Sequence, residues 1–438
     1  MKPQGSSGPR PLRATWAALG MVACSVAVLT MYGPWQQGAM AWRGTVPTPA
    51  ALPQQPCAAN PAAAAAPGEV CELEGTQYAC GTTAFDWKFY TEHYADLANL
   101  GATQAMLHWF QRGIGQGRRS HAGRKTLKIL LMTKDEWPLL RSWVLYHADL
   151  VGGSNLYIID GSTDPDAVAF LEQAQCQLGV HVFRSAANLS ELAELMTRLL
   201  KSLTMAADFL LKLDTDEFLA VSQPVPGGQD GVRRAVIGGP VLDYLDGLQL
   251  TGGRRMSTSL WQWGIPPEKC AGDPALHKAD AFEAIQRDEN RRKAIFQAAS
   301  FASVDLGSHG GRVREGFNKQ PLDTDLVLIE FRYDCYDRWT ANNRKAVLSH
   351  GYLSDHDSDE EALQKLEPLE DKAIPSRHKI KNYLGHLKDE QASRQAYYAH
   401  FASLRQIKYG ALRTKLQQLH REFDARVRRG AACAGPRL

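Results

Sequence analysis

Short apolar runs alternate with longer amphipathic stretches between residues 127 and 213 of this 438-residue chain. Periodicity alone leaves a helix open for each run, but their lengths are those of buried strands; they lie at 127–133, 155–159, 179–183 and 209–213. The intervening stretches place apolar residues at helical spacing, at 139–148, 165–176 and 189–205. This alternation predicts an α/β fold with a mostly parallel sheet flanked by helices.

Polar clusters follow three of the predicted strands. Residues 134–136 follow the first strand, residues 160–164 the second and residues 214–217 the fourth, and each cluster is acidic. Ligands of parallel sheets bind outside the carboxyl ends of the strands. The three clusters therefore predict a pocket for a nucleotide diphosphate and a metal ion.

Asp214 and Asp216 are central to this prediction because they form an Asp-x-Asp motif. If they continue the strand, both side chains point to the same face. Burying two neighbouring carboxylates without a cation is costly. A hard cation such as Mn²⁺ or Mg²⁺ removes that cost, with carboxylates, phosphate oxygens and water as ligands. The alternative is an exposed acidic turn.

Composition and missing motifs exclude other classes. With 44% apolar and 22% charged residues the chain is ordinary for a globular protein. A formal charge of +3 without a long basic block predicts no nucleic-acid partner. No Gly-x-x-x-x-Gly-Lys-Ser/Thr loop or Gly-x-Gly-x-x-Gly follows a strand, which argues against a nucleoside triphosphatase or a dinucleotide oxidoreductase.

The N-terminal region predicts a membrane anchor. A short basic tail (1–13) precedes an almost uncharged apolar stretch (14–34) of membrane-spanning length. A Pro- and Ala-rich stem (35–80) follows. We therefore expect a single-pass type II membrane protein whose tail is cytoplasmic and whose other domains face the Golgi or secretory-pathway lumen. The alternative is a signal peptide cleaved near residues 39–41.

Cysteine usage fits that compartment. Of eight cysteines, Cys24 lies in the predicted anchor and seven follow it. In an oxidising lumen some of these seven are expected to form disulfides. Asn188 begins an N-glycosylation sequon, which is consistent with a lumenal surface.

The motifs together resemble the glycosyltransferase A fold, a Rossmann-like fold, in its family-2-like and family-92-like branch (domain of unknown function 23). The resemblance is specific over 127–221 and looser to about 353. It rests on four matches: Lys134-Asp135-Glu136, Trp143 with Tyr146-His147, Asp160-Gly-Ser162-Thr-Asp164 and Asp214-Thr-Asp216-Glu217-Phe218. Asp135 replaces a more usual Asn, and Glu330 stands where relatives tend to have His.

The resemblance implies roles for particular residues. The nucleotide-binding residues would be Lys134, Glu136, Asp160, Asp164 and Asp214. The metal ligands would be Asp214, Asp216 and His309, and His309 would favour Mn²⁺. The candidates for the catalytic base are Asp305 and Glu315.

The resulting functional prediction is a metal-dependent glycosyltransferase of the hexosyltransferase type. It would move a sugar from a nucleotide-sugar donor, with a UDP-sugar favoured, to a glycan, glycoprotein or glycolipid acceptor. The resemblance implies inversion at the anomeric centre. Two alternatives remain: a carbohydrate-binding pseudoenzyme of the same fold, and a metal-dependent phosphohydrolase or nucleotidyltransferase using the same carboxylates.

Segments on either side of the transferase domain (123–387) complete the predicted organisation. Residues 81–122 place aromatic residues at helical spacing and predict a small helical module, either a spacer or a binding unit. It is similar to a short module found beside glycosyltransferase domains. The acidic run 355–361 predicts a solvated loop, and residues 388–438 predict one basic helix with a tail, the helix packing on the catalytic domain.

Overall fold

The computed structural model describes residues 70–429 except 74–75, 80–83, 188, 228–232, 249–250, 265–269, 271–281, 285–286, 289–291, 334, 404–405 and 409–410. The predicted tail, anchor and most of the stem lie outside the described residues, as does the sequon residue Asn188. No helix within the described ranges combines the length and apolarity needed to cross a bilayer.

The main sheet has the strand order β5-β4-β3-β6-β12-β9-β15-β7-β8. These strands are β3 (Leu127–Thr133), β4 (Leu156–Asp160), β5 (His181–Arg184), β6 (Phe209–Leu213), β7 (Glu217–Pro224), β8 (Arg233–Val236), β9 (Arg254–Gly264), β12 (Ala294–Gln297) and β15 (Asn318–Tyr333). The short strands are β1 (Val70–Leu73), β2 (Thr76–Ala79), β10 (Phe282–Ala284), β11 (Arg287–Asp288), β13 (Phe301–Ser303), β14 (Arg312–Val313) and β16 (Gln406–Lys408).

The α-helices are α1 (Trp87–His93), α2 (Ala102–His108), α3 (Leu139–Val151), α4 (Pro165–Leu178), α5 (Leu189–Ser202), α6 (Gly239–Gly247), α7 (Tyr336–Ser349), α8 (Asp359–Leu366), α9 (Arg377–Lys388), α10 (Glu390–Ser403) and α11 (Ala411–Arg428). Shorter helical turns are η2 (Ala95–Leu97), η3 (Trp109–Gly113), η4 (Gly153–Asn155), η6 (Ala298–Ser300) and η7 (Glu367–Leu369). The protein is thus mixed α/β, with a large sheet and flanking helices.

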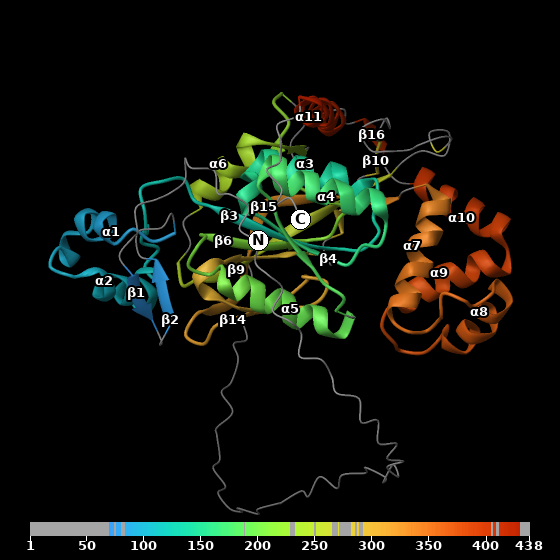
Figure 1. Ribbon diagram of the computed structural model, residues 1–438, viewed down its shortest axis with the longest axis horizontal. Coiled ribbons are helices and arrows are strands. Elements are labelled where there is room, and N and C mark those ends of the chain that lie inside the picture. The colour runs from blue at the N-terminus through green and yellow to red at the C-terminus, as the bar shows by residue number, and fades with distance from the viewer. Residues whose placement is uncertain are drawn as a thin grey trace, which may run out of the picture. The chain divides into compact units, whose positions relative to one another are not determined.

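The first half of the sheet is parallel, as the sequence predicts. β4 pairs with β3 in the register Thr133↔Asp160, and β6 pairs with β3 in the register Leu131↔Leu213, so the carboxyl ends of the three strands lie at one edge. α3 and α4 cover one face and α5 the other (Figure 1). Neighbouring strands β3 and β6 are thus a topological switch point, where α/β folds bind ligands.

Beyond β6 the sheet is mixed. β12 is antiparallel to both β6 and β9, β15 is parallel to β9, and β7 and β8 add antiparallel strands. β7 follows β6 along the chain but lies beside β15. The segment between β6 and β7, residues 214–216, therefore crosses from one part of the sheet to another.

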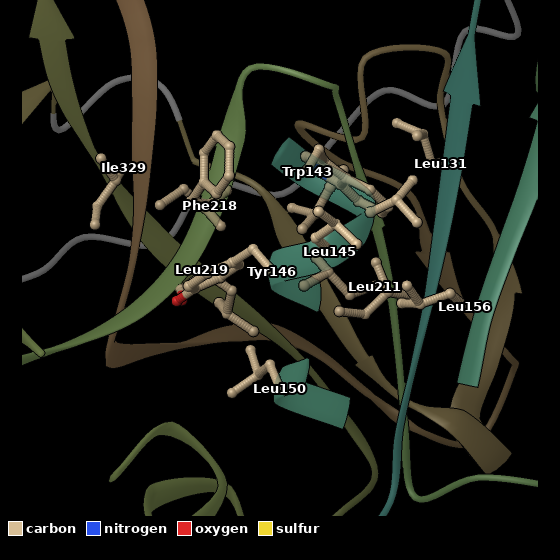
Figure 2. Packing of buried hydrophobic residues seen from close by; sticks show 14 of the residues in the cluster. Leu131, Trp143, Leu145, Tyr146, Leu150, Leu156, Leu211, Phe218, Leu219 and Ile329 are labelled. Carbon is tan, nitrogen blue, oxygen red and sulfur yellow. The ribbon is translucent and has the colours of Figure 1, made fainter. Parts of the chain in front are cut away.

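Helix α3 holds the two parts together. Figure 2 shows its side chains Trp143 and Tyr146 among leucines of β3, β4 and β6 and beside Phe218 of β7. Trp143 is fully buried, and the Tyr146 hydroxyl donates a hydrogen bond of 2.5 Å to the Leu219 carbonyl. Because α3 thus contacts β6 and β7, it fixes the ends of the segment that joins them.

Two expectations for the C-terminal part are wrong. The acidic run 355–361 is only partly a loop, because α8 begins at Asp359, where the Ser358 side chain caps the helix. The segment 388–430 forms two helices, α10 and α11, with β16 between them.

Helix α11 packs on the main domain, as expected. Its Asp424 pairs with Arg141 of α3, and Lys415 pairs with Asp149 at 2.8 Å. Phe423 packs edge-on against Phe170 of α4 with ring centres 5.5 Å apart. A disulfide joins Cys270 to Cys335, so the expectation that some of the seven cysteines pair is confirmed for these two.

Buried His147 of α3 makes folding stability depend on pH. Its Nδ1 bonds the Trp143 carbonyl at 3.0 Å, and burial lowers its pKa from 6.5 to about 3. Between these values the unfolded chain binds a proton that the folded chain does not, so stability falls as pH drops. From pH 7 to pH 5 the loss attributable to His147 is about 2 kcal/mol.

We expect His147→Gln to lose that part of the pH dependence. The measurement is the free energy of unfolding in urea at pH 7 and pH 5, with His356→Gln, at an exposed position, as the matched control. A pH dependence equal to wild type in His147→Gln would contradict the assignment.

Candidate functional site

The Asp-x-Asp motif forms a turn. β6 ends at Leu213, and the Glu217 N–H donates to the Asp214 carbonyl at 3.1 Å. The expectation that both aspartates lie on one face of a strand is therefore wrong, because side chains alternate regularly only in extended backbone. The turn gives the two aspartates different surroundings.

Asp214 is held by two buried lysines. Lys212, near the end of β6, contacts its Oδ1, and Lys293, just before β12, contacts its Oδ2 at 2.5 Å. Both lysine side chains are almost fully buried, whereas that of Asp214 is 40% exposed. Desolvation opposes ionisation, but Lys212 and Lys293 outweigh it and hold the pKa of Asp214 below its usual range. Asp214 is therefore a charged, rigidly held carboxylate.

Asp216 lies among other carboxylates. Its carbonyl accepts a 2.8 Å hydrogen bond from the Phe331 N–H, which brings the turn beside β15. Desolvation raises the pKa of Asp216 well above its usual range, and the charges of Glu330, Glu217 and Asp214 raise it further. A carboxylate in this position needs either a proton or a cation.

Glu217 joins the two environments. It is 2% exposed, its Oε2 accepts the Asp214 N–H at 2.8 Å, and its Oε1 lies 3.1 Å from Lys293. Burial raises its pKa to about 7 against the opposing charge of Lys293. Cross-strand pairing sets Glu217 opposite Glu330 of β15, which is also buried. Glu217 is thus a structural link within the turn.

The loop after β3 lies beside the turn. Glu136 contributes to the raised pKa of Asp216, and Lys345 of α7 holds it at 3.1 Å. The same ammonium donates to the Lys134 carbonyl at 2.8 Å. Asp135 has a left-handed backbone (φ 50°), and its Oδ1 accepts the N–H of Asp164 at 2.8 Å. Asp135 therefore joins the loops after β3 and β4, for which either Asp or Asn is suited.

Asp160 and Asp164 have structural partners. Asp160, at the end of β4, is 1% exposed; it accepts the Ser162 N–H at 2.9 Å and pairs with Arg184 of β5. Asp164 caps α4 by accepting the N–H of Asp166 at 2.8 Å, as its place before Pro165 predicts. Their predicted contacts with a nucleotide stay predictions.

The loop containing Asp305 and His309 runs beside Lys293. The Ala294 N–H donates to the Ser308 carbonyl at 2.9 Å, and the Asp305 carboxylate accepts the His309 N–H at 3.1 Å. Desolvation and the charge of Lys293 lower the pKa of His309. The loop is thus near the site, and the roles of His309 as metal ligand and Asp305 as base stay predictions.

Glu315 lies elsewhere. It is exposed and stands before the first residue of β15, where Asn318 pairs with Arg254 of β9. Glu330 pairs with Gln262 further along the same two strands, roughly 25 Å away at strand spacing. The role of Glu315 as catalytic base stays a prediction.

Three lysines at the site, Lys212, Lys293 and Lys345, are not predicted from the sequence. Lys212 carried a recognisable signal, a lysine inside an apolar run two positions before Asp214. Lys293 and Lys345 carried none, because they are distant in sequence and meet the acidic loops only through folding.

The donor set fits a hard divalent cation only in part. No group of three or more His, Cys, Asp or Glu side chains in the described ranges is arranged as a complete metal site. Asp214 has both oxygens engaged by lysines. Asp216 and Glu330 supply only oxygen donors, and Mg²⁺ or Mn²⁺ commonly uses one or two carboxylates with substrate phosphates. A cation shared with a bound diphosphate is therefore compatible with the site.

Crowding of carboxylates at the turn favours such a cation. Desolvation and the charges of Glu330, Glu217 and Asp214 disfavour ionisation of Asp216, and a divalent ion beside it would relieve that repulsion. The hydroxyls of Thr133 and Thr215, at the ends of β3 and β6, are buried without a hydrogen-bond partner in the described structure. Buried polar groups of this kind are uncommon unless a ligand or water completes them.

Comparison with known proteins gives structural similarity only. The sequence matches no protein-family model and no curated protein. TarS of S. aureus aligns with a TM-score of 0.28 and 10% identity over 64% of this chain and 44% of TarS, so the match spans less than half of that protein. The mannosyltransferase PcManGT of Pyrobaculum calidifontis, in complex with GDP-Man and Mn²⁺, aligns with a TM-score of 0.30 and 11% identity over 72% of this chain and 89% of that one. GalNAc-T7, with UDP, GalNAc and Mn²⁺, aligns with a TM-score of 0.27 and 9% identity over 65% and 60% of the two chains.

Proposed function

We propose that the protein is a metal-dependent glycosyltransferase that uses a nucleotide-sugar donor, with a UDP-sugar favoured. The observation that carries the proposal is the position of Asp216. It follows the carboxyl end of β6, the neighbour of β3, where desolvation and surrounding carboxylates raise its pKa. Such a position suits a cation that bridges protein and diphosphate.

The proposal gives each residue of the site a separate role. Asp216 and Glu330 would hold the cation, which stabilises the charge that develops on a leaving diphosphate. Lys212 and Lys293 keep Asp214 ionised and fixed. Asp305 remains our candidate for the base that takes the acceptor hydroxyl's proton in an inverting displacement. Membership of family 92 stays part of this proposal.

The compartment belongs to the proposal as well. The Cys270–Cys335 disulfide is typical of a protein that folds in an oxidising compartment. It is consistent with a lumenal catalytic domain. The type II membrane topology and the glycan, glycoprotein or glycolipid acceptor are further parts of the proposal. A protease-protection assay on microsomes with the full-length chain tests the orientation.

The enzymatic test measures donor use by the full-length protein. With Mn²⁺, a panel of UDP- and GDP-sugars is expected to include one that binds and is consumed, and EDTA is expected to abolish consumption. Transfer is scored on a mixed glycan acceptor pool, and hydrolysis is scored without acceptor. Mn²⁺-dependent binding of no nucleotide sugar would contradict the proposal.

Two outcomes would redirect it. Binding without turnover on any acceptor would identify a pseudoenzyme. Release of phosphate from simple phosphate esters at a rate above sugar transfer would identify a phosphohydrolase that uses the same carboxylates.

A further inference from the structure

A cavity in the described part of the chain lies away from the carboxylates. Its volume is about 510 Å³, within the range of small-ligand sites. It is lined by Tyr94 and Trp109 of the helical module, by Lys125 just before β3 and by Phe209 at the start of β6. Phe209 is separated from Asp214 by the length of β6, roughly 17 Å at strand spacing. The cavity is therefore a second site at the opposite edge of the sheet.

The helical module is built onto this edge. Its Gly115 carbonyl accepts the Gly252 N–H at 3.2 Å, and Arg119 pairs with Asp246 at 3.2 Å. Its apolar cluster includes Ala299 and Met205 of the main domain. The cavity walls are thus held by fixed packing from both sides, which favours a preformed site over a loose gap.

The charges that line the cavity are balanced. Arg118 forms a two-point pair with Asp96, at 2.9 and 3.0 Å. Arg119 is paired with Asp246, and the Asp208 carboxylate accepts the Thr126 N–H at 2.7 Å. Lys125 donates to the carbonyls of Asp246 and Leu248 at 2.9 and 2.5 Å.

This balance selects against an anionic ligand. Arg118 and Arg119 are paired with Asp96 and Asp246, Asp208 is paired with His121 at 3.0 Å, and the Lys125 ammonium is held by backbone carbonyls. A phosphate or sulfate group would have to displace one of these partners, whereas a neutral ligand would not.

Hydrogen-bonding capacity nevertheless remains. The side-chain oxygen of Gln297, another lining residue, is buried and has no hydrogen-bond partner in the described structure. Its position in β12 pairs with Phe209, so it belongs to the same edge. An unsatisfied acceptor favours a ligand rich in hydroxyl donors.

We propose that this cavity is a second carbohydrate-binding site, which takes a neutral sugar unit of a glycan. Tyr94 and Trp109 contribute aromatic side chains to the lining, and Lys125, Asp246 and Gln297 contribute polar ones, the combination that suits a polyhydroxylated ring. The site would hold a glycan chain away from the reacting end. It rests on the proposed function for its role, but not for its binding chemistry.

The test uses the full-length protein without donor or Mn²⁺. Neutral tetrasaccharides of glucose (α- and β-linked), mannose, xylose and N-acetylglucosamine are titrated by calorimetry, with inorganic phosphate and sulfate as the anion arm. At least one tetrasaccharide is expected to bind. Gln297→Leu should weaken that binding by about tenfold because one hydrogen bond is lost.

Two further variants separate the sites. Gly247 lines the cavity, and a Cβ added there meets nothing within 4 Å, so Gly247→Trp should occlude the cavity without a clash at its root. It also keeps the test open if Gln297→Leu does not fold. Asp216→Asn, at the carboxylate site, should bind the tetrasaccharide as wild type does.

The overturning results are distinct from a failure of the transferase. Binding of none of the tetrasaccharides, or displacement of a bound one by phosphate or sulfate, would overturn the proposal. Binding that is lost in Asp216→Asn but kept in a folded Gly247→Trp variant would place the sugar at the carboxylates and overturn it too.

Discussion

Asp216→Asn is expected to lower kcat for sugar transfer by about 1,000-fold while the protein stays folded. The Asn side chain is neutral and binds a divalent cation more weakly than the Asp carboxylate does. The charge that develops on the leaving diphosphate would then lose its stabilisation. The same change removes one of the crowded negative charges around Glu330 and Glu217. The metal-free variant should therefore be at least as stable as wild type.

The loss of activity and the unchanged metal-free stability can be measured on the same variant, which separates a catalytic role of Asp216 from a structural one. Melting curves with and without Mn²⁺ and UDP should show stabilisation by the ligands in wild type and none in Asp216→Asn. Asp355→Asn, at an exposed position, should behave as wild type in activity and melting. Unchanged turnover in Asp216→Asn would remove Asp216 from the site, and a large drop in its metal-free Tm would make its role structural.

Lys293→Met is expected to lower the free energy of unfolding by about 3–5 kcal/mol. Lys293 is fully buried and compensates both Asp214 and Glu217. Methionine fills much of the space but leaves two carboxylates without that ammonium. The measurement is guanidinium denaturation at pH 7.

Neighbouring and second-site variants make this prediction specific. Arg292→Met removes the adjacent cation, whose side chain is 40% exposed and pairs with Asp323, and should cost less than about 1 kcal/mol. Adding Glu217→Gln to Lys293→Met should recover part of the loss, because one buried charge disappears with its partner. Equal losses in Lys293→Met and Arg292→Met would contradict the assignment.

The parallel half of the sheet could be predicted because its signals are local. β3 occupies the predicted 127–133, and α4 begins at the predicted Pro165, since apolar periodicity and capping act over a few residues. The mixed half could not be predicted in the same way. The pairing of β9 with β15 joins residues such as Met256 and Leu322, whose contact depends on the whole fold.

The acidic residues of the site could be predicted from the sequence, but the lysines that compensate their charge could not. Carboxylates after β6 stand out between apolar residues. The turn that separates Asp214 from Asp216, and the lysine from the edge of β12, follow from tertiary packing. The pattern of acidic residues therefore indicates where the site lies, but it does not show that lysines engage Asp214 and not Asp216.

The packing of α11 on α3 and α4 has a consequence for folding during synthesis. Phe423 and Asp424 meet Phe170 and Arg141, so a helix from the last part of the chain covers one built much earlier. During synthesis, the apolar surface of α3 and α4 stays uncovered on that side until α11 has left the ribosome. Chains that stop before residue 411 would expose this surface permanently, which makes them substrates for chaperones and quality-control proteases rather than smaller enzymes.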